Sequence, residues 1–298
     1  MERRTLIKSA AICTALATTL AATAKGQPAS GGGRIRSGPL IEAGDGTRLF
    51  CRDWGEGAPV LFCHPWGLNG GIWEYQLTEL SDQGVRCIAY DRRGHGRSDD
   101  PGHGYDFPAL ASDLATIIER LDLQGVTLVG YSMGSAEAIH YISRYGKDRI
   151  SRLVLVSPIA PARGEHSMID DFITALKKDR PAAMSAGLPL FLGKSSTVSP
   201  ALAQWVLEQF LQSSPKAIIE CQRAIAAEDH QQLLQSLTIP TLIIQGDKDE
   251  VSQLELTGRK LSQAIHGSEL RIYEGAPHGI GLTHRDRLTR DLIDFVRS

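Results

Sequence analysis

Short apolar segments alternate with longer amphipathic ones along most of this 298-residue chain. Within the short segments the apolar residues follow one another almost without polar interruption, which is typical of parallel strands covered on both faces by helices. Five segments have this character: residues 59–64, 85–90, 126–131, 152–157 and 241–246. The alternation predicts an α/β fold with a mostly parallel sheet.

Amphipathic patterns lie between and after these predicted strands. Residues 107–123 place apolar side chains at intervals of three and four, as one face of a helix requires: Leu110, Leu114, Ile117, Ile118 and Leu121. Residues 133–146 and 284–298 are further predicted helices. The stretch "GDGTRLFCRDWGEG" (44–57) predicts an antiparallel hairpin strand at the start of the sheet.

The alternation stops between about residues 158 and 238. Helical patterns follow one another there with no strand-like run between them: "SMIDDFITALKKD", "PALAQWVLEQFLQSS" and "PKAIIECQRAIAAE". Ligands of open α/β sheets bind at the carboxyl ends of the strands. We therefore expect this insertion to form a helical lid over that edge of the sheet.

Composition narrows the classes of protein that fit. With 42% hydrophobic residues the chain can bury one large core. A formal net charge of −2 lacks the basic excess of nucleic-acid-binding surfaces, so no nucleic-acid partner is predicted. Beyond the N-terminal segment, no apolar run approaches the roughly 20 residues that span a bilayer. No Cys/His pattern has metal-ligand spacing, and we predict neither a metal nor a cofactor.

The N-terminal segment resembles a twin-arginine export signal. Arg3 and Arg4 precede an apolar run, and Ala22-Thr23-Ala24 fits the small-x-small pattern of a signal peptidase site. We therefore expect cleavage after Ala24 and a periplasmic or secreted protein. The predicted organisation is a signal peptide (1–24), a flexible Gly/Ser-rich lead-in (25–38) and one domain with its lid (39–298).

Four cysteines remain after such a cleavage, and an even number in an exported protein permits disulfides. Cys63 and Cys87, however, lie within apolar strand-like runs, where a free cysteine behaves as a small buried hydrophobe. The sequence favours free thiols at these two positions and at Cys51 and Cys221.

Ser132 lies in "GYSMG", which matches G-x-S-x-G between a predicted strand and a predicted helix. In that context a sharp strand-to-helix turn exposes the serine hydroxyl. Side chains at Gly130 and Gly134 would collide with neighbouring elements, which explains the two glycines. The pattern predicts Ser132 as a nucleophile and the backbone N–H of Met133 as a donor to the reacting oxygen. The alternative is an incidental Gly/Ser turn before a helix.

A serine nucleophile needs a base and an acid, which follow it in the order acid, then histidine, in this architecture. His278 lies in "YEGAPHGIG", between a strand-like run and the final helix. His64 also follows a predicted strand but precedes the serine. For the acid, "TLIIQGDKDE" offers Asp247, Asp249 and Glu250 at the end of a strand. The residue pattern leaves Asp247 and Asp249 open, since aspartate also bonds local backbone in turns.

From about Ile41 to Phe295 the chain resembles the α/β-hydrolase superfamily and, more narrowly, its cofactor-free haloperoxidase/perhydrolase and arylesterase group. The resemblance is carried by "FCHPWGLNGGIW", "AYDRRGHGRSD", "GYSMG", "IPTLIIQGDKDE" and "YEGAPHG", which occur in the family's order. It implies an α/β-hydrolase fold with an eight-stranded, mostly parallel sheet. It also implies a catalytic triad of Ser132, Asp249 and His278.

The same resemblance identifies an oxyanion loop. In the family this loop reads His-Gly-aromatic, and the aromatic residue donates its backbone N–H. Here the loop reads His64-Pro65-Trp66-Gly67. Proline has no N–H, but the donor implied by the resemblance is Trp66, which keeps its own. We expect Trp66 also to bind substrate, and His64 to brace the loop rather than take part in the chemistry.

The resemblance implies a serine hydrolase that cleaves carboxylic esters, with perhydrolase or haloperoxidase activity when peroxide replaces water. The expected partner is a small ester or related acyl compound. A lactonase or a carbon–carbon bond hydrolase on the same triad is the alternative, and a ligand-binding receptor with a vestigial triad is a third. Apolar lid residues suggest a hydrophobic pocket, unless they only pack the lid helices: Phe172, Leu190, Phe191 and Trp205.

Overall fold

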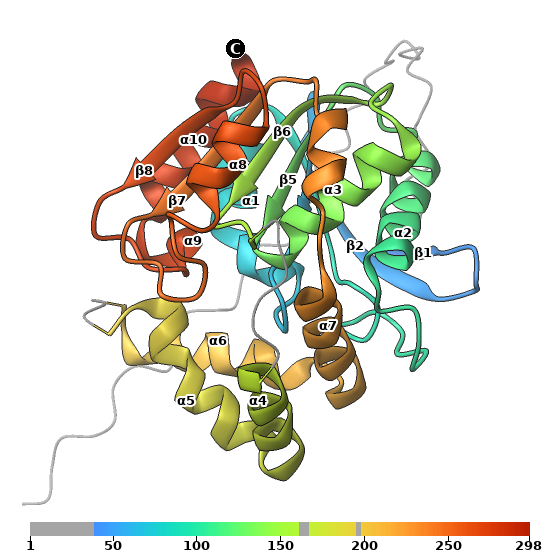
Figure 1. Ribbon diagram of the computed structural model, residues 1–298. Helices are drawn as coiled ribbons and strands as arrows, with labels where there is room; N and C mark the ends of the chain where they lie inside the picture. The colour runs from blue at the N-terminus through green and yellow to red at the C-terminus, as the bar shows by residue number, and fades with distance from the viewer. Residues whose placement is uncertain (1–38, 161–166, 195–197) are drawn as a thin grey trace, which may run out of the picture. The chain divides into compact units, whose positions relative to one another are not determined.

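The computed structural model describes residues 39–160, 167–194 and 198–298 (Figure 1). The predicted signal peptide and lead-in lie outside these residues. Among the described residues no helix has both the length and the apolar composition that a membrane span requires.

Eight strands form one sheet in the order β1-β2-β4-β3-β5-β6-β7-β8. β2 pairs antiparallel with both β1 and β4, and every other pairing is parallel. The predicted eight-stranded, mostly parallel sheet and its antiparallel start are therefore confirmed. The strands are β1 (Leu40–Glu42), β2 (Arg48–Trp54), β3 (Ala58–Cys63), β4 (Val85–Tyr90), β5 (Val126–Tyr131), β6 (Ile150–Val156), β7 (Thr241–Gly246) and β8 (Glu269–Tyr273).

Helices cover both faces of the sheet. One face packs on α1 (Glu74–Asp82) and α10 (Arg285–Arg297), and the other on α2 (Phe107–Arg120), α3 (Met133–Tyr145) and α8 (Gly258–Ala264). Short helical turns complete the connections: η1 (Gly70–Trp73), η2 (Gln231–Ser236) and α9 (Ile280–Thr283). The sequence pattern predicted α2, α3 and α10 but did not single out α1 or α8.

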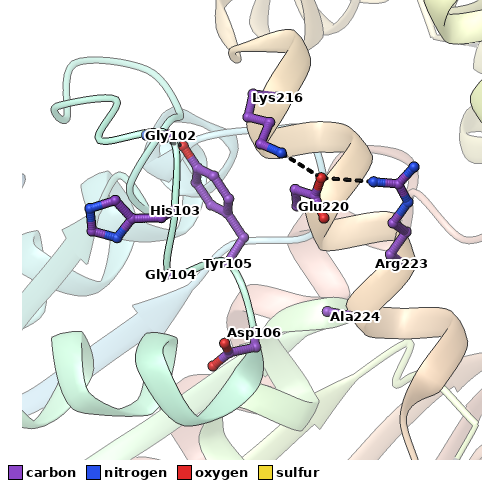
Figure 2. A pocket seen from close by; sticks show the side chains of 9 residues that line it. All are labelled: Gly102, His103, Gly104, Tyr105, Asp106, Lys216, Glu220, Arg223 and Ala224. Carbon is purple, nitrogen blue, oxygen red and sulfur yellow. Dashed lines mark hydrogen bonds and ion pairs between the residues drawn. The ribbon is translucent and has the colours of Figure 1, made fainter.

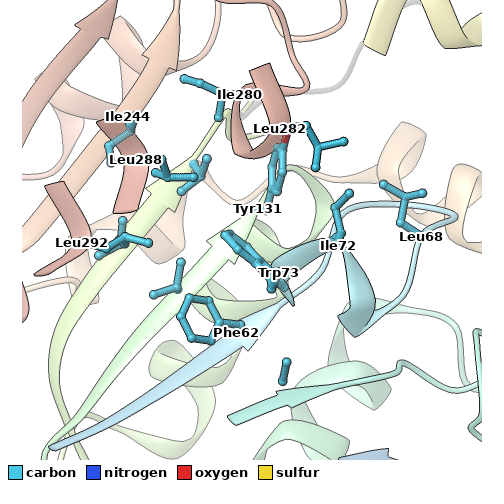
Figure 3. Close-up of a cluster of buried hydrophobic side chains, with 14 of the residues drawn as sticks. Phe62, Leu68, Ile72, Trp73, Tyr131, Ile244, Ile280, Leu282, Leu288 and Leu292 are labelled. Atoms are coloured by element: carbon cyan, nitrogen blue, oxygen red, sulfur yellow. The ribbon is translucent and has the colours of Figure 1, made fainter. Parts of the chain in front are cut away.

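The two covered faces explain the continuous apolar runs. Consecutive residues of β3, Leu61 and Phe62, belong to the cores on opposite faces of the sheet, because side chains alternate along a strand. On the α1/α10 face, the buried ring of Trp73 lies 4.9 Å from that of Phe62 and 5.5 Å from that of Tyr131, centroid to centroid (Figure 3). This packing supports the end of β5, where Tyr131 precedes Ser132.

Between β6 and η2, the described residues form four α-helices: α4 (Ser167–Lys178), α5 (Arg180–Leu192), α6 (Pro200–Gln212) and α7 (Pro215–Ala227). Figure 1 shows them gathered beside one end of the sheet. The sequence pattern indicated three of them and missed α5, because Pro189 inside it cannot donate to the preceding turn. α5 begins where Asp179 accepts a hydrogen bond from the Ala182 N–H, with Pro181 in the first turn.

All four predicted thiols are free and buried: Cys51, Cys63, Cys87 and Cys221. Burial raises the pKa of the Cys221 thiol to about 12 and that of the Cys63 thiol well above its usual range. These cysteines act as core side chains, as the sequence indicated.

Candidate active site

Ser132 occupies the turn between β5 and α3. Its backbone has φ 53° and ψ −117°, a combination that residues other than glycine rarely adopt. A Cβ on Gly130 would lie 2.4 Å from the Gly134 carbonyl oxygen, and one on Gly134 would lie 2.5 Å from the Cys63 carbonyl oxygen. Both glycines are therefore required by close backbone approach, as the sequence pattern predicted.

The structure brings the three predicted triad side chains together from three loops. His278 Nε2 lies 3.0 Å from Ser132 Oγ, and His278 Nδ1 lies 2.8 Å from Asp249 Oδ2. Asp249 follows β7 and His278 follows β8. All three residues are buried, so few water molecules compete for these contacts.

Asp249 is held so that one carboxylate oxygen faces the histidine. Its Oδ1 accepts hydrogen bonds from the backbone N–H groups of Val251, at 3.0 Å, and Ser252, at 2.7 Å. Its Oδ2 pairs with His278 Nδ1 at 2.8 Å and also accepts a longer hydrogen bond from Gln245 Nε2, at 3.4 Å. This arrangement fixes the ring orientation and places the imidazole proton on Nδ1.

The other two acid candidates bond elsewhere. Asp247 is exposed, and its Oδ1 accepts a hydrogen bond from the Gly275 N–H at 2.7 Å. Glu250 is exposed and forms an ion pair with Lys194, at 2.7 Å. Asp247 thus ties two loops together, which is the structural role that the residue pattern had left open for it.

The histidine loop is anchored from both the core and the lid. The Tyr131 hydroxyl donates to the carbonyl oxygen of His278, at 2.6 Å, and the Gly279 N–H donates to the carbonyl oxygen of Phe191, at 2.6 Å. The Phe191 ring stands edge-on to the imidazole with centroids 5.8 Å apart. The Phe191 main-chain contact has no sequence signal, because any residue there would supply the same carbonyl group.

The two backbone donors predicted for the oxyanion hole lie on neighbouring strand ends. Cys63 at the end of β3 pairs with Gly130 in β5, so the loop carrying Trp66 adjoins the turn carrying Met133. Among the described residues, neither the Trp66 N–H nor the Met133 N–H donates a backbone or side-chain hydrogen bond. Two free donors beside a nucleophile are what a developing oxyanion requires.

The Trp66 side chain contacts the lid. Its indole N–H donates to the carbonyl oxygen of Ile218 in α7, at 2.8 Å. Its ring centroid lies 5.7 Å from that of Phe172 and 6.0 Å from that of Phe210. Phe191 lies 6.1 Å from Phe210. Aromatic rings from α4, α5 and α6 therefore surround the oxyanion loop and the imidazole.

The four predicted lid residues have different environments. Phe172 and Phe191 join this aromatic group, and Trp205 packs partly buried against the core. Leu190 is exposed to solvent. Unlike the other three, it does not pack in the hydrophobic core cluster of the described residues.

A separate cavity of about 450 Å³ lies between α7 and the loop before α2 (Figure 2). None of the predicted site residues lines it. Lys216 and Arg223 each bond Glu220 at 2.8 Å, so the carboxylate offsets one of the two positive charges on the α7 wall and a net charge of +1 remains there. The lining residues are Gly102, His103, Gly104, Tyr105, Asp106, Lys216, Glu220, Arg223 and Ala224.

Comparison with known proteins agrees with this geometry. The family model described as "alpha/beta hydrolase fold" matches residues 58–285. The chain belongs to this family. It is 36% identical over 277 residues to a protein named non-heme chloroperoxidase CPO-A1 from Kitasatospora aureofaciens, a match that covers 87% of this chain and 99% of the relative.

Two further similarities are informative. A bifunctional esterase/perhydrolase from Acinetobacter calcoaceticus is 32% identical, over 85% of this chain and 98% of its own. The solved structure of an esterase from Exiguobacterium antarcticum superimposes with a TM-score of 0.85 and 33% identity, over 88% of this chain and all of its own. The hydrolase therefore resembles relatives over nearly their full length.

Gly134→Ala should lower the free energy of unfolding by about 1–3 kcal/mol, because the added methyl group must push β3 away from α3. Gly187→Ala is the matched control. Gly187 is also helical, in α5, but an added Cβ there meets no atom within 4 Å. That variant should be up to about 1 kcal/mol more stable than wild type. Equal effects in urea denaturation would contradict the close approach at Gly134.

Proposed function

We propose that this hydrolase cleaves small carboxylic esters through an acyl-enzyme on Ser132. The observation that supports this most directly is the continuous chain of contacts from Asp249 through His278 to the Ser132 hydroxyl. The match to a bifunctional esterase/perhydrolase, which covers 98% of that relative, supports the same chemistry.

In the first half-reaction, Ser132 Oγ attacks the ester carbonyl carbon while His278 Nε2 takes the hydroxyl proton. Asp249 then faces an imidazolium and stabilises its charge. The carbonyl oxygen becomes an oxyanion and accepts hydrogen bonds from the N–H groups of Trp66 and Met133. Collapse of this intermediate breaks the bond to the alcohol, which leaves with the proton from Nε2.

In the second half-reaction, water attacks the acyl-enzyme and His278 again takes and returns the proton, so that the acid leaves and Ser132 is restored. Hydrogen peroxide can replace water in this step. The product is then a peracid, which oxidises halide in solution. This route gives a haloperoxidase activity in which the protein itself performs only acyl transfer.

The substrate class follows from the side chains around the triad. Trp66, Phe172, Phe191 and Phe210 present aromatic rings next to the imidazole and the oxyanion loop. Such walls favour a hydrophobic acyl or aryl group. A lactone is a cyclic ester and would use the same triad, so a lactonase is the second candidate, and parallel assays on p-nitrophenyl esters and lactones distinguish the two.

Ser132→Ala should reduce ester hydrolysis by roughly four to six orders of magnitude, because triad residues act as a unit. Steady-state turnover of p-nitrophenyl acetate and butyrate measures the loss, and thermal melting checks that the variant is folded. Mass spectrometry of wild type quenched during turnover should find one acyl group on Ser132. A folded variant that still hydrolyses the esters would exclude Ser132 as the nucleophile.

Asp249→Asn should lower kcat by roughly 10⁴-fold, because an amide facing Nδ1 favours the wrong imidazole tautomer. Asp247→Asn is the control. It keeps an acceptor for the Gly275 N–H and should leave kcat within a few-fold of wild type. The reverse outcome, loss at Asp247 with activity at Asp249, would reassign the acid.

We also propose that the protein is exported by the twin-arginine route to the periplasm or beyond. The support is sequence alone: Arg3-Arg4, the apolar run after them and Ala22-Thr23-Ala24.

Expression of the full chain in a bacterium with that pathway should yield periplasmic protein whose N-terminal residue is Lys25 by mass spectrometry. Replacing both Arg3 and Arg4 by Lys should retain the protein in the cytoplasm. Intact Met1 on the wild-type protein in the cytoplasmic fraction would refute export.

A further inference from the structure

His64 is fully buried beneath the oxyanion loop, and its hydrogen bonds define its tautomer. Its Nε2 lies 2.9 Å from the backbone nitrogen of Arg92. A backbone N–H can only donate, so Nε2 carries no proton. Burial, together with the charge of Arg92, holds the pKa of His64 well below its usual range. The ring is therefore neutral, and its one proton is on Nδ1.

That proton is directed at the oxyanion loop. His64 Nδ1 lies 2.8 Å from the carbonyl oxygen of Pro65 and donates to it. Arg92 Nη1 lies farther from the same nitrogen, at 3.3 Å, and cannot donate to it once Nδ1 carries the proton. This carbonyl belongs to the same peptide unit as the Trp66 N–H. In a trans peptide the C=O and N–H groups point in opposite directions, so fixing the oxygen fixes the direction of the N–H. A hydrogen bond on the oxygen also polarises the amide and strengthens its N–H as a donor.

A buried ion pair ties this arrangement to α3. Arg92 Nη2 donates to the carbonyl oxygen of His64, at 2.8 Å, and to Glu137 Oε2, at 2.6 Å. Arg92 Nε also donates to Glu137 Oε2, at 3.0 Å, and the Tyr90 hydroxyl donates to the other oxygen of Glu137. Glu137 lies one turn along α3 from Met133. Both oxyanion donors are therefore positioned by the same helix.

We propose that His64 is a positioning residue for catalysis: its Nδ1–H sets the Pro65–Trp66 peptide so that the Trp66 N–H faces the oxyanion, and Arg92 with Glu137 holds His64 to the helix that carries Met133. The proposal rests on the proposed ester hydrolysis. The oxyanion exists only after attack, so His64 affects kcat and the binding of tetrahedral analogues, and leaves substrate KM nearly unchanged.

Two near-isosteric variants separate the two hydrogen bonds of the ring. In His64→Asn the side-chain amide can take the place of Nδ1 and still donate to Pro65. In His64→Gln the amide can take the place of Nε2, so it meets the Arg92 N–H and leaves the Pro65 carbonyl without its donor. Each variant loses one of the two bonds, which makes them mutual controls for stability.

His64→Gln should lose up to about 10²–10³-fold in kcat, the effect of disabling one oxyanion donor, with KM within a few-fold of wild type. Its inhibition constant for an aryl trifluoromethyl ketone, which forms a tetrahedral adduct with the serine, should rise in parallel. His64→Asn should keep kcat within about tenfold. Equal losses in the two variants, or an unchanged inhibition constant in a folded His64→Gln, would overturn the proposal.

Arg92→Lys provides the test if neither histidine variant folds. Lysine keeps the positive charge beside Glu137 but has one nitrogen in place of Nε and Nη2, so it cannot reproduce both the paired contact with Glu137 and the bond to the His64 carbonyl. The turnover number kcat and the affinity for the ketone should therefore fall together. Unchanged values for both would overturn the proposal. A fluorophosphonate reacts with an activated serine nucleophile. If it fails to label Ser132 in wild type, the proposed ester hydrolysis itself is contradicted; if it labels Ser132, a negative result with the variants contradicts only the role of His64.

Discussion

The close approach of α3 to the end of β3 is the constraint on which the rest of the site depends. Gly134 lies so near the Cys63 carbonyl that no side chain fits between them. Because the helix begins that close to the sheet, the chain must turn within one residue, and Ser132 takes a left-handed conformation that it would otherwise avoid. The same approach places the first amide of α3 beside the loop that leaves β3. Nucleophile and oxyanion donors thus follow from one packing contact.

Parallel strand order then gathers the remaining groups. Ser132, Asp249, His278 and Trp66 follow four strands of the same sheet, β5, β7, β8 and β3, and all parallel strands end at one edge. Residues far apart in sequence are therefore adjacent without any special folding of the loops. The lid reaches this edge through a main-chain bond, from the Gly279 N–H to Phe191, and an indole bond, from Trp66 to Ile218. The base and the oxyanion loop are each tied to a lid helix.

The sequence predicted what depends on side-chain pattern. Continuous apolar runs predicted the parallel strands, and the glycines around Ser132 predicted the sharp turn between β5 and α3. The choice of Asp249 over Asp247 came from family resemblance, because both are turn aspartates after β7 and only three-dimensional contacts separate them. The sequence pattern did not predict helix α5, because Pro189 lies inside it and proline is unfavourable within a helix. Main-chain contacts such as that of Phe191 leave no trace in the residue types.

The buried charges beneath the oxyanion loop have a geometric rather than an energetic rationale. An ion pair such as Arg92–Glu137 is commonly no more stabilising than apolar residues of the same volume, although removing one partner costs about 3–5 kcal/mol. What apolar residues cannot supply is direction. Arg92 bonds the carbonyl of His64 and, through its own main chain, the ring nitrogen of His64. The main-chain bond makes Nε2 an acceptor, so the neutral imidazole has one tautomer and its proton on Nδ1 points at the Pro65 carbonyl. Pro65 has no N–H, so the loop depends on the N–H of Trp66 as its donor to the oxyanion. The direction of that N–H is set by the hydrogen bond from His64 to the Pro65 carbonyl, which belongs to the same peptide unit.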